Sequence, residues 1–463
     1  MKNKSFLIIV LLALCIAIGV LPSQNSVAYA NSALKYWEGV TGSGALVSDE
    51  NVPIVVEKET ITFNINEFPS VNYSEEAFHN YASNVTAEYI FYNPSEYDVS
   101  ATLVFPYGNT PMYGYVKPSD EKYGIKINGE TINSKIRHTY HDHYSYYDFD
   151  YTEAVPKILD DYVDDTFYSP DLPVYKHTYE VSDLSLGNCV ATFTLPNAID
   201  VRYYLVGGSS KEVGPDGSKT IGYGTWVKPN DTVVLYVIGK DVEVSDYAFY
   251  ENYSHDATRC SGTFTLKNKE TLTFKELALL NHDEGSDVLE VDYYNAVVDM
   301  LNSGRDLGIN MNDCLMGWYQ YELNVTAGDK VINTVTAPLY PNINKSYEPP
   351  KYDYNYYLTP AKSWASFGEL TINVNTTAYM LNSSIDGFEK VDTGYRLVRN
   401  GLPNEDLSFT LCEDEKPKKE VNWGYYLIII IPISILVVLV AIIVTIVVVV
   451  KKKRKKKNMN KKD

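Results

Sequence analysis

The sequence predicts a mainly β protein, in which two or three β-sandwich-like units form an ectodomain and one transmembrane helix lies near the C-terminus. Short runs of alternating apolar and polar residues, separated by turn residues, recur along most of the chain and are typical of sandwich strands. Tyrosine, which favours strands because its ring packs while its hydroxyl reaches water, occurs 41 times. A single long apolar stretch near the end of the chain predicts the helix.

That stretch, residues 425–450, contains no charged residue. A helix rises about 1.5 Å per residue, so this length crosses a hydrocarbon core of roughly 30 Å. A basic tail, residues 451–463, follows it, and basic segments stay on the cytoplasmic side. We therefore expect a single-pass plasma-membrane protein with its N-terminus outside and its C-terminus in the cytoplasm. Its membrane anchors at the two boundaries would be Trp423, Lys451, Lys452 and Lys453.

The other end of the chain has the features of a signal peptide. Lys2 and Lys4 precede an apolar run, and Ala28-Tyr29-Ala30 matches the small-x-small cleavage pattern, so we expect cleavage after Ala30 and export. The formal net charge of −19 includes +8 from the tail and +2 from the signal peptide, which leaves −29 for the ectodomain. So acidic a surface argues against nucleic acid as a partner.

These signals divide the chain into eight segments. They are a signal peptide (1–30), a first β-sandwich (31–140), an acidic Tyr-rich insertion (141–173), a second β-sandwich (174–281), a third β-rich unit (282–412), a stalk (413–424), the transmembrane helix (425–450) and the basic cytoplasmic tail (451–463). The third unit contains the best helix candidate of the ectodomain, Val288 to Leu301, where apolar residues recur at helical spacing.

Part of the first sandwich resembles a known family. The run Val85 to Ser95, the strand Val99 to Pro106 and the Gly124 to Glu130 hairpin, within residues 82–140, resemble the VIT domain. That β-sandwich begins inter-alpha-trypsin inhibitor heavy chains and many bacterial surface proteins. A von Willebrand A domain with an Asp-x-Ser-x-Ser metal site usually follows it. Here Asp183 to Gly187 lacks the second serine, so metal-dependent adhesion is not implied.

Three of the seven histidines, His138, His141 and His143, lie within six residues. If the segment is extended, His141 and His143 share a face and can supply two ligands to a divalent metal such as Zn²⁺ or Cu²⁺. The alternative is that all three are surface groups at the end of a strand, because no fourth ligand is placed by spacing.

The acidic insertion carries three candidate ligand-binding residues, Tyr144, Tyr146 and Tyr147, whose rings can stack on sugars or wall polymers. Aromatic residues of β proteins also serve as core or strand surface, and this alternative stays open. Four cysteines lie in the predicted ectodomain, and in an oxidising compartment they allow two disulfides with three possible pairings. These disulfide candidates are Cys189, Cys260, Cys314 and Cys412.

Catalytic motifs are missing from the sequence, which has no His-Glu-x-x-His, no Gly-x-Ser-x-Gly and no phosphate loop. We therefore expect a cell-surface protein whose ectodomain is not an enzyme, needs no cofactor, and binds or adheres to a wall polymer, a glycan or a protein. Two other classes stay open: an accessory subunit of a membrane transport or wall-assembly complex, and an ectodomain hydrolase. The Ala-x-Ala signal and the bias toward Lys, Asn and Tyr are typical of a bacterial protein.

Overall fold

The structure is a computed structural model and is mainly β, as predicted. It describes residues 36–37, 42–43, 45–47, 52–69, 83–106, 123–141, 151–211, 220–244, 246–254, 256–358, 361–362, 364–419, 440 and 443–452. The predicted signal peptide and its cleavage site at Ala30 lie outside these ranges.

An eight-stranded sheet forms the centre of the first unit. Its inward positions alternate with half-exposed ones, as in β4, where Ile61 and Phe63 are fully buried. Central β4 and β24 run parallel, and the other neighbours in the sheet are antiparallel. In spatial order the strands are β26 (Glu389–Val391), β27 (Gly394–Asn400), β24 (Ser366–Asn375), β4 (Val55–Asn64), β5 (Asn84–Tyr92), β20 (Lys330–Pro338), β7 (Gly124–Ile127) and β8 (Glu130–Thr131).

Two smaller sheets cover one face of this sheet and share its hydrophobic core. One contains β3 (Leu46–Val47), β6 (Val99–Pro106), β19 (Leu315–Val325) and β9 (Lys135–Tyr140). The other contains β1 (Tyr36–Trp37), β21 (Asn342–Asn344), β23 (Lys351–Tyr357), β28 (Leu407–Cys412) and β25 (Tyr379–Ser383), with β2 (Gly42–Ser43) beside β23. A short pair, β22 (Tyr347–Glu348) and β29 (Lys418–Lys419), lies apart.

A second unit is inserted between β9 and β19. It is a sandwich of two sheets around a core that includes Phe193, Phe249 and Phe264. The first sheet has the order β12 (Val201–Leu205), β15 (Thr232–Gly239), β10 (Pro173–Ser182) and β18 (Thr263–Thr273). The second has the order β13 (Ser209–Lys211), β14 (Thr220–Val227), β11 (Cys189–Pro196), β16 (Asp246–Tyr250) and β17 (Arg259–Cys260).

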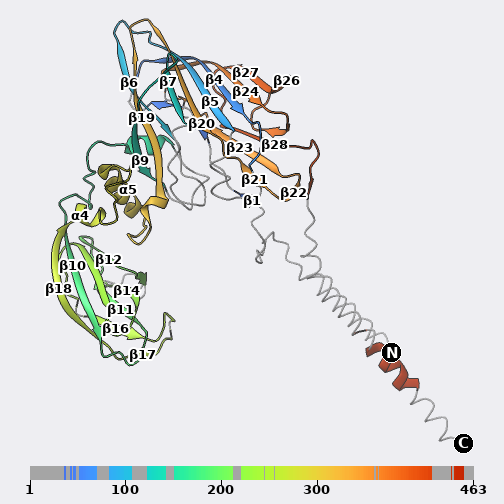
Figure 1. Cartoon of the computed structure of the whole chain (residues 1–463). Helices are drawn as coiled ribbons and strands as arrows, with labels where there is room; N and C mark the ends of the chain where they lie inside the picture. Colours follow the sequence, from blue (N-terminus) through green and yellow to red (C-terminus); the bar gives the residue numbers. More distant parts are fainter. Residues whose placement is uncertain are drawn as a thin grey trace, which may run out of the picture.

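Short helices lie where the two units meet (Figure 1). They are α3 (Tyr151–Ala154), η1 (Val155–Lys157), α4 (Phe274–Ala278), α5 (Glu290–Asn302) and η2 (Met311–Cys314). Thr273 and Glu276 form a capping box at the start of α4, which satisfies backbone amides that a helix N-terminus leaves without partners. The predicted helix from Val288 to Leu301 is confirmed as α5, which packs against β9 of the first unit.

The strand pairing joins two predicted segments into one unit. Strands from residues 31–140 and 282–412 were expected in separate units, yet β5 pairs with β20 and β6 pairs with β19. The first unit is therefore discontinuous in sequence. Apolar alternation identifies a strand but carries no information about a partner more than 200 residues away. Strands β10 to β18 run from residue 173 to residue 273, and the second sandwich was predicted over residues 174–281.

The C-terminal part of the chain is described only at residue 440 and over residues 443–452, which are helical. Within the described ranges, no helix combines the length and the apolar character needed to cross a membrane. Most of the predicted transmembrane segment, 425–450, lies outside those ranges, as do Trp423 and Lys453. Lys451 and Lys452 form the last described residues of the helix.

Candidate functional site

The second unit has an open hollowed surface at the end where the chain passes from β11 to β12. Two adjoining hollows share Ile199, an isoleucine that is 89% exposed at the tip of this turn. The smaller, of about 410 Å³, is lined by Asn197, Ala198, Ile199, Val201, Arg202, Tyr203 and Tyr223. The larger, of about 840 Å³, is lined by Thr166, Phe167, Leu172, Pro173, Tyr175, Ile199, Asp200, Gly239, Lys240 and Asp241. We call the two together the Ile199 surface.

The turn that carries Ile199 is held close to the end of β15. Gly239 pairs with Val201 and has a φ of +95°, a conformation that side chains with a Cβ rarely adopt. A Cβ at this position would lie 2.6 Å from the carbonyl oxygen of Asp200. Glycine at position 239 is therefore what allows residues 199 and 200 to sit between the two hollows.

Arg202 forms a fixed positive group on the wall between the hollows. Its guanidinium lies 4.5 Å from the centre of the Phe167 ring, a cation–π contact. Its Nη1 donates hydrogen bonds to the carbonyl oxygens of Ala198, Ile199 and Val201 at 3.3, 3.2 and 2.9 Å. Because these contacts already restrict the side chain, a ligand that binds beside it loses little additional side-chain entropy.

Two tyrosines line the smaller hollow. The rings of Tyr203 and Tyr223 lie edge to face with centres 5.9 Å apart, and the Tyr203 hydroxyl donates to the carbonyl of Pro196 at 2.8 Å. Burial raises the pKa of each hydroxyl to about 12. Both tyrosines are therefore neutral at physiological pH and present a polar tip on an apolar ring.

Charged groups of both signs surround the larger hollow. Lys240 and Asp200 form an exposed pair at 4.0 Å, and Lys269, which is paired with Asp241, lies 5.6 Å from the centre of the Tyr175 ring. Although burial acts to raise the pKa of the Asp241 carboxyl, the bonds and charges of Lys269 and His177 hold it below its ordinary value. Asp241 is therefore ionised at neutral pH.

A second exposed aromatic feature lies on the outer face of the same sandwich. Trp226 of β14 and Tyr253 pack edge to face, with ring centres 5.7 Å apart, and both are large exposed apolar residues. Among the described residues, no charged side chain forms an ion pair or a cation–π contact with Trp226 or Tyr253. The pair is a weaker candidate than the Ile199 surface because it offers ring faces without polar groups around them.

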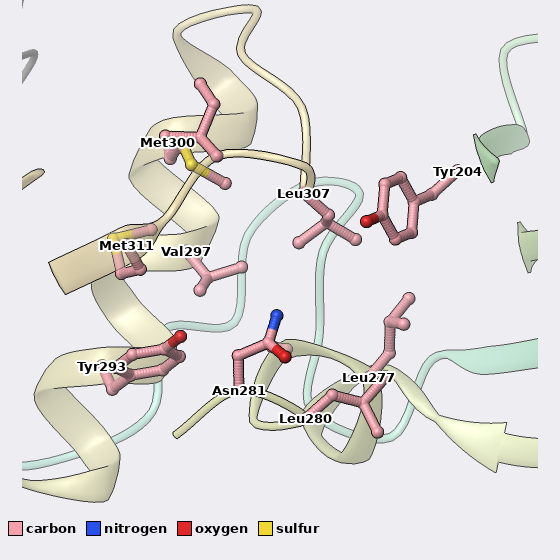
Figure 2. A pocket seen from close by; sticks show the side chains of 11 residues that line it. Tyr204, Leu277, Leu280, Asn281, Tyr293, Val297, Met300, Leu307 and Met311 are labelled. Atoms are coloured by element: carbon pink, nitrogen blue, oxygen red, sulfur yellow. The ribbon is translucent and has the colours of Figure 1, made fainter. Parts of the chain in front are cut away.

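A small cavity lies between the helices and the second sandwich (Figure 2). Side chains of α4, α5 and β12, among them Leu277, Val297 and Tyr204, point toward its centre. Its volume of about 30 Å³ is close to the share of liquid volume that one water molecule occupies. This cavity is therefore too small for an organic ligand.

A buried ion pair joins α5 to the first unit. Arg137 of β9 and Asp292 of α5 are 0% and 1% exposed at their side chains, and Nη2 of Arg137 lies 2.9 Å from Oδ1 of Asp292. Nε of Arg137 contacts both carboxylate oxygens at 3.1 Å, and the backbone amide of His138 donates to Oδ2 at 2.7 Å. Nη1 reaches Asp160 and Gln320, each at 3.0 Å. The pair is structural, because both groups are fully enclosed.

A buried carboxyl group lies in the core of the first unit. Glu59 of β4 is 1% exposed, and burial raises its pKa to about 7, while a hydrogen bond from the Tyr89 hydroxyl acts in the opposite direction. Its Oε2 has no hydrogen-bond partner among the described residues. Tyr89, Tyr321 and Tyr356 are buried close to one another around this position. Because all of these side chains are enclosed, a substrate does not reach them in this conformation.

The predicted metal ligands are only partly described. His138 is buried in β9, and burial lowers its pKa to about 4, whereas His143 lies outside the described residues and His141 is the last residue before that gap. Across the described ranges, no three His, Cys, Asp or Glu side chains converge on one point. A divalent metal at His138, His141 and His143 stays a prediction.

The other predicted site residues are dispersed. Tyr144, Tyr146 and Tyr147 lie outside the described residues. The four cysteines carry no disulfide in the structure, and Cys189, Cys314 and Cys412 are buried while Cys260 is half-buried. The Ile199 surface was not predicted, because its walls come from four separate stretches of sequence, around Phe167, Ile199, Tyr223 and Asp241.

Comparisons with known proteins add little to this description. No family model matches the chain, and no curated protein does. A solved structure from Legionella pneumophila, provisionally described as a nutrient binding protein, aligns over 81% of this chain and 72% of its own, with 9% identity and a TM-score of 0.30. A likeness at this level carries no argument about fold or function. The resemblance to the VIT domain likewise stays a prediction.

Proposed function

We propose that the protein is a single-pass cell-surface protein whose ectodomain binds a glycan, such as a sugar polymer of the cell wall, at the Ile199 surface. The observation that supports this most directly is the larger hollow, whose walls carry the aromatic rings of Phe167 and Tyr175 and charged side chains of both signs. Sugar rings pack on aromatic groups, and their hydroxyls form hydrogen bonds with charged side chains. Anchoring in the membrane is supported by the apolar stretch 425–450 and the basic residues that follow it.

We propose binding without catalysis. A glycoside hydrolase needs a pair of carboxyl groups, one of which stays protonated near neutral pH. In the larger hollow the pKa of Asp241 is lowered, which does not suit a general acid, and Asp200 faces Lys240. Glu59 has a raised pKa but is enclosed in the core of the other unit.

The test is a glycan and wall-polymer binding screen on the full chain, followed by binding measurements on single variants. Ile199→Asp is expected to weaken binding by about tenfold or more, because it places a new negative charge beside Asp200 at the rim of both hollows. The fold should tolerate this change, since Ile199 is almost fully exposed. Repeating the screen with a chelator tests the predicted metal at His138, His141 and His143.

Leu186→Asp is the matched control. Leu186 is also an exposed apolar residue in a turn, but it precedes β11, whereas Ile199 follows it. The control should bind like the unmodified chain. Equal binding by all three proteins would rule out the Ile199 surface, and loss of binding in Trp226→Ala alone would place the site at the Trp226–Tyr253 pair instead.

A further inference from the structure

Two of the four cysteines lie at one end of the second sandwich. Cys189 is the first residue of β11 and Cys260 is the last residue of β17, and both strands belong to the same sheet with β16 between them. Phe249 of β16 pairs with Ala191 on one side and with Cys260 on the other. Side chains two residues apart lie on one face of a strand, so Cys189 and Ala191 both face the core against which Cys260 also packs.

The backbone segments beside the two cysteines are hydrogen-bonded to each other. The amide of Ser185 donates to the carbonyl of Ser261 at 3.1 Å, and the amide of Ser261 donates to Oγ of Ser185 at 3.1 Å. A Cβ on Gly262 would lie 2.6 Å from the ring of Phe249 and 2.7 Å from Leu184. The turn before Cys189 is therefore fixed against the segment that follows Cys260. Burial raises the pKa of the Cys189 thiol, and the neighbouring Cys260 thiol raises it further.

The other two cysteines are placed differently. Cys314 is buried in the core of the helical layer, and Sγ of Cys412 contacts the carbonyl oxygens of Pro350 at 3.4 Å and Pro349 at 3.6 Å in the first unit. Cys412 belongs to neither the core of the helical layer nor that of the second sandwich. Among the four cysteines, only Cys189 and Cys260 therefore lie at the same hydrophobic core.

We propose that Cys189 and Cys260 form a structural disulfide bond when the chain meets an oxidising compartment. The oxidant is a disulfide, of a protein or of a small molecule. The half-buried Cys260 thiol loses its proton and attacks one sulfur of the oxidant, which releases one thiolate and leaves a mixed disulfide. The Cys189 thiolate then attacks Sγ of Cys260 and releases the second thiolate. Two protein thiols thus lose two protons and two electrons, and the oxidant is reduced to two thiols.

The bond would join the edge strand β17 to the interior strand β11 and close the chain from residue 189 to residue 260 into a loop. Closing so long a loop restricts the unfolded chain and raises the stability of the sandwich. The inference concerns the scaffold of the second unit and holds whether or not the Ile199 surface binds a glycan. The oxidation can be carried out on purified protein, so its result is separate from any test of export or binding.

The experiment uses the purified full chain, fully reduced and then incubated with oxidised glutathione. Peptide mapping without reductant is expected to show one linked pair of peptides, carrying Cys189 and Cys260 and lighter by two hydrogen atoms than the reduced pair. Reduction of the oxidised protein should lower the midpoint of thermal unfolding by about 5–10 °C. In Cys260→Ser, which alters a half-buried position, this shift should disappear.

Cys412→Ser is the matched control and should keep both the linked peptides and the thermal shift. The proposal is overturned if Cys189 and Cys260 are alkylated in denaturant without reductant after the oxidation step. It is also overturned if either is linked to Cys314 or Cys412, or if Cys260→Ser keeps the full shift.

Discussion

Replacement of Asp292 by alanine is expected to lower the free energy of unfolding by about 3–5 kcal/mol. The change leaves the guanidinium of Arg137 buried without its carboxylate, and an unpaired buried charge is among the most destabilising outcomes of a single substitution. The loss should be local at first, since the pair joins α5 to β9. Urea denaturation measures the total effect, and hydrogen exchange of the α5 amides measures the local one.

Asp299→Ala is the control for this prediction, because it makes the same change in the same helix. Asp299 pairs with Lys157 at 3.3 Å, and both side chains are partly exposed, so the expected loss is below about 1 kcal/mol. Equal losses in the two variants would show that the buried pair contributes no more than an ordinary surface pair. Replacing Arg137 and Asp292 together by apolar residues should restore much of the stability.

Glu59→Gln is expected to change how stability depends on pH. In the folded protein burial raises the pKa of Glu59 from 4.5 to about 7, so the folded state holds this proton more tightly than the unfolded chain does. The resulting stabilisation is complete below pH 4.5 and is lost as the pH rises to about 7. Across this window the loss amounts to about 3 kcal/mol.

The glutamine variant keeps the shape of the side chain but has no proton to lose. Relative to the unmodified protein it should therefore gain about 3 kcal/mol between pH 4.5 and pH 8, measured by urea denaturation at both pH values. Glu88→Gln, at an exposed position of the neighbouring strand β5, should change by less than about 0.5 kcal/mol. A pH-independent difference for Glu59→Gln would mean that the Glu59 carboxyl titrates alike in the folded and unfolded states.

The position of Glu59 shows where prediction from sequence stops. Strict alternation places Glu57 and Glu59 on the same face of β4, opposite Val56. The structure has an irregularity between Val56 and Lys58, which turns both Val56 and Glu59 inward. Gly368 of β24 accommodates it, because a Cβ there would lie 2.1 Å from the carbonyl oxygen of Glu57. A bulge of this kind depends on the partner strand, and the local pattern does not contain it.

The bounds of helix α5 were predicted from the sequence, but its surroundings were not. Its position was predicted to within two residues at each end, because helical spacing is a local property. The apolar spacing within Val288 to Leu301 gives no reason to expect Asp292 to be buried, yet the structure buries it against β9. Nearly all sides of this helix are enclosed because it lies between two units, and that placement follows from the discontinuous first unit.

The adjacent ends of the inserted unit affect how this chain can evolve. Tyr140 pairs directly with Leu315, so the backbone leaves the scaffold and returns at adjacent positions. Because the two ends of the inserted segment are adjacent, recombination can replace the segment without changing the strand order of the first unit. A replacement segment must also supply a carboxylate that pairs with Arg137, because this buried guanidinium belongs to β9 and stays when α5 is replaced.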